Sequence, residues 1–60
     1  MGPVSATIFD QVAARIGAVA ASAWMFSANA NLGGRAPIQA LREGDVDAVK
    51  RAMLRIGEDA

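Results

Sequence analysis

The segment from Asn29 to Pro37 constrains the fold of this chain more than any other part of it. It reads Asn-Ala-Asn-Leu-Gly-Gly-Arg-Ala-Pro. Asn and Gly tolerate left-handed backbone angles, and Pro suits the first turn of a new helix because its missing N–H would be unpaired there anyway. We therefore expect one helical piece to end before this segment and another to begin at Pro37.

The rest of the chain favours helices and carries no strand signal. Alanine, the best helix former, is abundant, and apolar and polar residues do not alternate with a period of two. Thr7 with Asp10 approximates a capping box, which places the start of the first helix near Ser5 or Thr7. Apolar residues then recur at helical spacing and form one stripe: Ile8, Val12, Ile16, Val19 and Ala23.

Gly17 interrupts this stripe at a place where glycine costs up to about 1 kcal/mol relative to alanine. It either divides the segment into two helices or permits close packing against a neighbour. We favour a break, with the second helix carrying Trp24 and ending near Ser27.

Two further helices follow the loop. The helix that starts at Pro37 has one apolar face and a natural C-terminal stop at Gly44. Asp45 suits the N-cap of the last helix, and Asp47 with Arg51 forms an i,i+4 pair worth about 0.2–0.5 kcal/mol. We expect one all-α domain over residues 1–60, a small bundle of three to four short helices. Its predicted core comprises Trp24, Leu32, Ile38, Leu41, Val49, Met53 and Ile56.

A bundle of 60 residues is marginal by itself, because so short a chain buries only about 60% of its surface on folding. The chain has no Cys and no His, which excludes disulfides and the usual soft metal sites. Yet 53% of its residues are hydrophobic. Association is the remaining route to stability, so we expect a dimer or higher oligomer, with the alanine-rich surface from Val12 to Ala23 as the candidate interface.

The charges argue against nucleic-acid binding by this chain alone and against catalysis. Six Lys and Arg residues balance six Asp and Glu residues and are interleaved with them, whereas nucleic-acid binders carry a basic patch. Acid–base chemistry would fall to carboxylates that stand where helix caps and solvated faces place them. We expect no enzyme activity, no cofactor and no metal.

The apolar run from Ile16 to Phe26 raises the question of export. Ala28-Asn29-Ala30 after it resembles a small-x-small cleavage site. The segment before the run is itself apolar and carries Asp10 and Arg15, and the run is far shorter than the ~20 residues that span a bilayer. We favour a cytoplasmic protein that does not enter a membrane, with an exported and cleaved peptide as the alternative.

The loop itself has three interpretations. As an anion cradle, its N–H groups and Arg35 would hold a phosphate at the start of the Pro37 helix, but Leu32-Gly33-Gly34 matches neither a P-loop nor a dinucleotide fingerprint. As a structural turn, Leu32 enters the core, the glycines bend the chain, and Arg35 is solvated or paired with a carboxylate. The third interpretation is a family signature.

In order and spacing, residues 24–56 resemble the toxin-binding domain of Xre/MbcA/ParS-type antitoxins. The likeness is carried by Trp24-Met25, Asn29, the run from Leu32 to Ile38, Leu41, Gly44 and Val49. Met25 and Ile38 replace leucines of the family pattern, and Ala28 and Ala30 replace common prolines. The residues expected to build this motif are Trp24, Asn29, Leu32, Gly33, Gly34, Pro37, Leu41 and Gly44.

The resemblance implies a cytoplasmic, dimerising, non-enzymatic antitoxin. Its partner would be a RES-domain toxin that consumes NAD⁺, neutralised by docking and by a C-terminal tail pushed into the active-site entrance. A helix-turn-helix domain typically precedes such domains, and we expect none within residues 1–60, so autorepression is not carried over; the chain is either a fragment or a short stand-alone protein. The residues expected to contact the partner are Arg35, Arg51, Arg55, Glu58, Asp59 and Ala60. The alternative is a homodimerisation module of a larger transcriptional regulator without toxin-binding activity.

Overall fold

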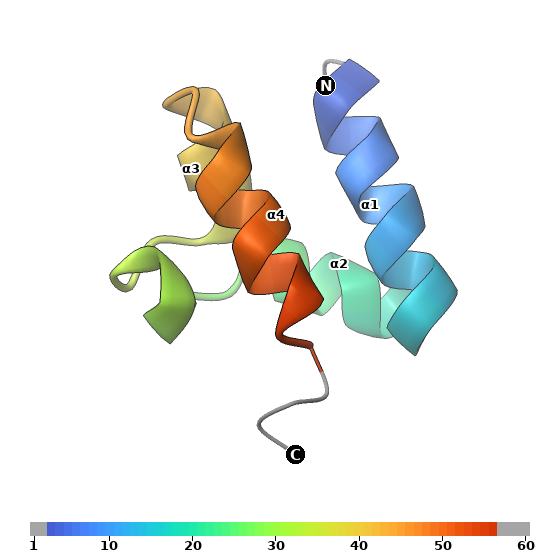
Figure 1. Ribbon diagram of the computed structural model, residues 1–60. Helices are drawn as coiled ribbons and strands as arrows, with labels where there is room; N and C mark the ends of the chain where they lie inside the picture. Colours follow the sequence, from blue (N-terminus) through green and yellow to red (C-terminus); the bar gives the residue numbers. More distant parts are fainter. Residues whose placement is uncertain (1–2, 57–60) are drawn as a thin grey trace.

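The computed structural model describes residues 3–56, which form four α-helices and one short 3-10 helix, with no strand among them (Figure 1). The elements in chain order are α1 (Pro3–Ile16), α2 (Ala18–Phe26), η1 (Ala30–Leu32), α3 (Pro37–Arg42) and α4 (Val46–Leu54). α2 packs against both α1 and α3, while α4 packs against α3 and η1. The predicted all-α bundle of short helices is confirmed.

The corner between α1 and α2 depends on Gly17, as the sequence predicts. Its φ of 87° and ψ of 160° lie in a region that is essentially restricted to glycine. Its N–H still donates to the carbonyl of Ala13 at 2.8 Å, and its own carbonyl accepts from Ala21 at 2.9 Å. The residue therefore closes one helix and opens the next without losing a backbone hydrogen bond.

This corner divides the apolar stripe that periodicity predicts. Ile8 and Val12 on α1 are buried. Val19, however, is 88% exposed, and Ile16 and Ala23 are exposed as well. The predicted single stripe is thus wrong beyond Val12. Ile16 is the last residue of α1, at the corner itself, and the change of direction at Gly17 takes Val19 and Ala23 away from the core.

The first helix begins earlier than the capping-box interpretation places it. α1 starts at Pro3, so Thr7 and Asp10 lie inside the helix and do not cap it. Proline is favoured in the first helical turn, since its fixed φ matches and its missing N–H would have no partner there. The sequence analysis applied this preference to Pro37 but not to Pro3. Applied to Pro3, it gives the observed start of α1.

The core lies between α2, α4 and the inner faces of α1 and α3. Of the predicted core residues, Leu32, Ile38, Val49 and Met53 are buried, whereas three others only pack against the core from its edge: Trp24, Leu41 and Ile56. Ala21 and Met25 on α2 are also buried, although the sequence analysis did not place them in the core. α2 is apolar on all sides, so no periodicity marks its inner face.

The boundaries after the loop follow the predicted stop and start signals. Pro37 occupies the first turn of α3, and Gly44 follows this helix with a φ of 84°. Asp45 is the N-cap residue of α4, but its side chain makes no capping hydrogen bond. The expected pair of Asp47 and Arg51 is absent among the ion pairs of the described residues. No helix within residues 3–56 is long and apolar enough to cross a bilayer.

The Gly17 conformation gives a stability prediction. Gly17→Ala should lower the free energy of unfolding by about 1–3 kcal/mol, because alanine must adopt the strained backbone region. Steric collision is not the cause, since a Cβ at this position meets nothing within 4 Å. Urea denaturation followed by circular dichroism at 222 nm measures the change.

Gly33→Asn is the matched control. Gly33 also lies in open space, but its φ of 66° and ψ of 27° are left-handed helical, a conformation that asparagine tolerates. Gly17→Asn should be clearly less stable than Gly33→Asn. Equal losses at the two positions would contradict the assignment of strain to Gly17.

Candidate functional site

The loop between α2 and α3 is organised by Asn29. Its side-chain Oδ1 accepts a hydrogen bond from the N–H of Asn31 at 2.9 Å, which starts η1. Its carbonyl accepts from Leu32 at 2.9 Å and from Gly34 at 3.0 Å, and its N–H donates to the carbonyl of Arg35 at 3.0 Å. Asn29 is extended, with a φ of −124°, so the left-handed angles fall on the glycines alone. The loop therefore closes on itself and turns Leu32 into the core.

Arg35 ties this loop to the turn between α3 and α4. Its Nε donates to the carbonyl of Leu32 at 2.9 Å. Its Nη1 pairs with Oε1 of Glu43 at 2.8 Å, and its Nη2 pairs with Oδ2 of Asp45 at 2.9 Å. The hydrogen bond from Arg35 holds the pKa of the Asp45 carboxyl below its usual value. These contacts match the structural-turn interpretation, and contact of Arg35 with a partner stays a prediction.

An open hollow of about 320 Å³ lies between α4 and the segment that follows α2. Its lining includes Trp24, Asn29, Asn31, Ala52, Arg55 and Ile56. The remaining lining residues are alanines, and no acidic side chain within residues 3–56 lines the hollow. Sequence analysis selected Trp24 and Arg55 separately, but no sequence signal predicts that residues 28–31 meet the end of α4.

Trp24, which the sequence places in the core, packs against the core from its edge. It is half-buried and lines the hollow. Its indole N–H has no acceptor among the described residues, and the nitrogen is open to solvent. A partly buried tryptophan with an unused donor is a group that an interface can still employ.

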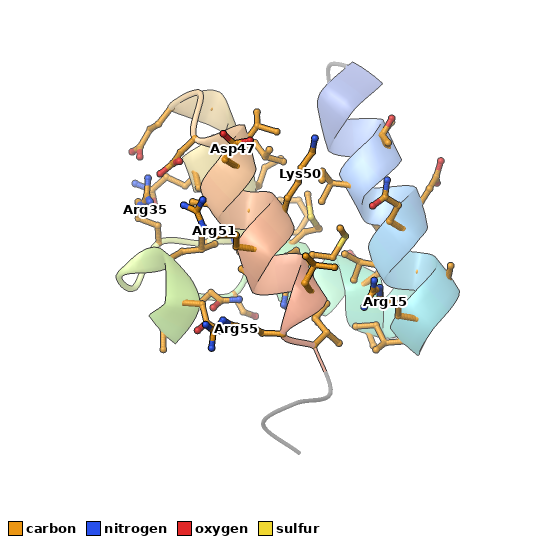
Figure 2. All side chains as sticks on the ribbon, viewed as in Figure 1. Arg15, Arg35, Asp47, Lys50, Arg51 and Arg55 are labelled. Carbon is orange, nitrogen blue, oxygen red and sulfur yellow. The ribbon has the colours of Figure 1, made fainter. Side chains whose placement is uncertain are left out.

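Two guanidinium groups follow one side of α4. Arg51 and Arg55 are one helical turn apart and exposed, and Figure 2 shows both on the side of α4 that faces the loop, whereas Lys50 points toward α1. Neither arginine forms an ion pair with any described residue. The other three residues expected at the partner surface, Glu58, Asp59 and Ala60, lie outside the described residues.

The fold and this surface define a small helical protein-binding domain with unpaired cations beside an indole. Comparison with protein families identifies its kind. The antitoxin Xre/MbcA/ParS C-terminal toxin-binding domain matches residues 9–57. The chain therefore belongs to this family, which confirms the resemblance that the residues from Trp24 onward predict. Comparisons with curated proteins and with solved structures found no match.

The Arg35 contacts give a pH prediction. Because the folded-state pKa of Asp45 lies below its unfolded value, the ionised carboxylate stabilises the fold above about pH 4, and this contribution is lost as the pH falls through the lowered pKa. Asp45→Asn should therefore be less stable than the unchanged chain at neutral pH. The difference in urea midpoint should shrink toward zero on acidification through the lowered pKa of Asp45.

Asp47→Asn serves as the control, since Asp47 is exposed and makes no ion pair within the described part of the chain. This variant should keep the acid-dependent loss of stability that Asp45→Asn lacks. An Asp45 resonance that titrates at the unfolded value in an NMR pH series would refute the proposed interaction.

Proposed function

We propose that residues 1–60 form a single toxin-binding module that neutralises a RES-domain toxin by docking on it and occluding its active-site entrance. Membership of the antitoxin toxin-binding family over residues 9–57 carries this proposal. Arg51, on α4, and Arg55, its C-cap residue, support it, because exposed cations that form no ion pair with a described residue can pair with carboxylates of another protein.

The direction of the chain links docking to occlusion. Arg51 lies in the last turn of α4 and Arg55 is its C-cap residue, and Glu58, Asp59 and Ala60 follow a few residues later in the sequence. Docking through this end of α4 would therefore bring the tail of the chain to the same region of the toxin. NAD⁺ contains a diphosphate, so a site that binds it must offer donors for negative charge. We infer that the tail carboxylates compete for those donors.

The neutralisation is steric and electrostatic, and needs no chemistry by the antitoxin itself. The two functions are separable along the chain. Arg51 and Arg55 supply docking affinity, and Arg35 contributes to it only where a partner carboxylate reaches its exposed edge. The residues beyond Ile56 supply the block, and the site of action is the cytoplasm, where the toxin meets its NAD⁺.

The test is to purify the chain with the RES-domain toxin encoded beside it and to measure NAD⁺ consumption. The unchanged chain should form a complex and suppress NAD⁺ loss as the two reach equal stoichiometry. Arg51→Gln with Arg55→Gln should weaken the complex at least about tenfold, because both docking charges are lost. Deletion of residues 57–60 should leave a measurable complex in which NAD⁺ consumption resumes.

Arg42→Gln is the matched control, since Arg42 is an exposed arginine on α3 rather than α4. It should bind and inhibit like the unchanged chain. The proposal is contradicted if the folded antitoxin forms no complex with this toxin. If the chain without residues 57–60 still inhibits fully, the tail does not block the active site.

A second function, homodimerisation within a larger regulator, is favoured by the outer face of α2. Val19, Ala23 and Phe26 follow one another at helical spacing, and Val19 and Phe26 are 88% and 64% exposed. No charged residue occurs between Arg15 and Arg35. A helix that is apolar on all sides is normally buried, and an uncharged face can pack against its own copy about a two-fold axis.

Val19→Glu tests this interface by placing a carboxylate at the most exposed position of the apolar face. Sedimentation of the unchanged chain should show a dimer, and Val19→Glu should shift it to a monomer because two like charges would meet across the axis. Gln11→Glu, at an exposed position of α1, should leave the dimer intact. A monomer over a wide range of concentrations for the unchanged chain would dismiss the interface.

A further inference from the structure

We propose that the hollow beside α4 receives a carboxylate-bearing side chain of the toxin that stands next to a bulky apolar side chain. Arg55 pairs with the carboxylate, while Trp24 and Ile56 contact the apolar group. This inference rests on the proposed function. It adds which kind of toxin side chain is recognised and which part of this chain recognises it.

The donors around the hollow select the carboxylate. Among the described residues, the guanidinium of Arg55 forms no ion pair and the indole N–H of Trp24 has no acceptor. No acidic side chain within residues 3–56 lines the hollow. Glu43 and Asp45, in the turn before α4, are held by Arg35 at 2.8 and 2.9 Å. Within the described part of the chain, no carboxylate thus neutralises Arg55.

The lining selects the apolar neighbour. Trp24 and Ile56 are both half-buried, and Ala52 beside them is buried, so the floor of the hollow is apolar. A volume of about 320 Å³ accommodates a large side chain rather than a whole helix. Tryptophan and arginine are also the residues most enriched among those that dominate binding energy, particularly where contacts around them exclude water.

A second copy of this chain fits the hollow less well than the toxin. The apolar face that a second copy would offer, Val19 to Phe26 on α2, contains no carboxylate to meet Arg55. The hollow and the α2 face therefore recognise different chemistry. Both can be occupied in one assembly.

Trp24 is the only tryptophan in the chain, so it provides a direct probe of the hollow. The antitoxin is produced with 5-fluorotryptophan and gives a single ¹⁹F resonance. Addition of unlabelled RES-domain toxin should shift this resonance and reduce its sensitivity to exchange of H₂O for D₂O, because the bound toxin side chain excludes solvent from the indole. Addition of further antitoxin without toxin should not produce this change.

Affinity measurements supply the second readout. Arg55→Gln should weaken toxin binding roughly tenfold and reduce the salt dependence of Kd, since one charge pair is lost. Arg42→Gln should change neither quantity. Arg55→Glu reverses the charge and should abolish toxin binding. Binding should be restored by a lysine in place of the one acidic toxin residue that stands beside an apolar residue. Lysine at any other acidic position of the toxin should not restore it.

The outcomes separate this inference from the proposed function. A chain that forms no complex with the toxin contradicts the proposed function itself. Two outcomes would leave the proposed function intact but exclude the hollow as the recognition site. One is a stable complex in which the Trp24 resonance is unchanged. The other is equal toxin binding by Arg55→Gln and Arg42→Gln. A shift produced by antitoxin alone would assign the hollow to a second copy instead.

Discussion

The guanidinium of Arg35 fixes the geometry on which the rest of the surface depends. One planar group serves the carbonyl of Leu32, the carboxylate of Glu43 and the carboxylate of Asp45. Exposed ion pairs contribute little individually, but a rigid fork that meets three acceptors at once sets the positions of the groups that carry them. The glycine turn is thereby held against the start of α4. Residues 28–31 form one wall of the hollow and α4 forms the other. Without this link, the distance between the two walls would be less well fixed.

The same contacts divide the charges of the described residues into two groups. Glu43 and Asp45 are engaged within the chain, whereas Arg51 and Arg55 have no ion-pair partner there. A chain with zero formal net charge therefore presents a locally cationic edge along α4. Net charge alone would have hidden this edge, because it reports the sum of the charges and not which of them are already paired.

Sequence analysis predicts those features that depend on one residue's backbone preference, such as the break at Gly17, the start of α3 at Pro37 and the stop at Gly44. It fails where two local signals compete, as at the start of α1, and where an element is apolar on all sides, as in α2. The hollow could not be predicted, since it depends on tertiary contact between η1 and α4 across about twenty residues of chain. The family was recognisable because its motif is the turn itself.

The corner at Gly17 also limits how the chain can vary in length. Each residue of an α-helix rotates the next by about 100°, so one residue inserted or deleted between Val12 and Gly17 would turn the whole of α1 by that angle about its axis. A deletion would replace Ile8 and Val12 in the core by the polar Thr7 and Gln11, and an insertion would replace Ile8 by the larger Phe9. A loop could absorb such a change, but a corner made by a single residue has no slack. Substitutions on the outer face of α1 are therefore tolerable, while a change in the number of residues between Val12 and Gly17 is not.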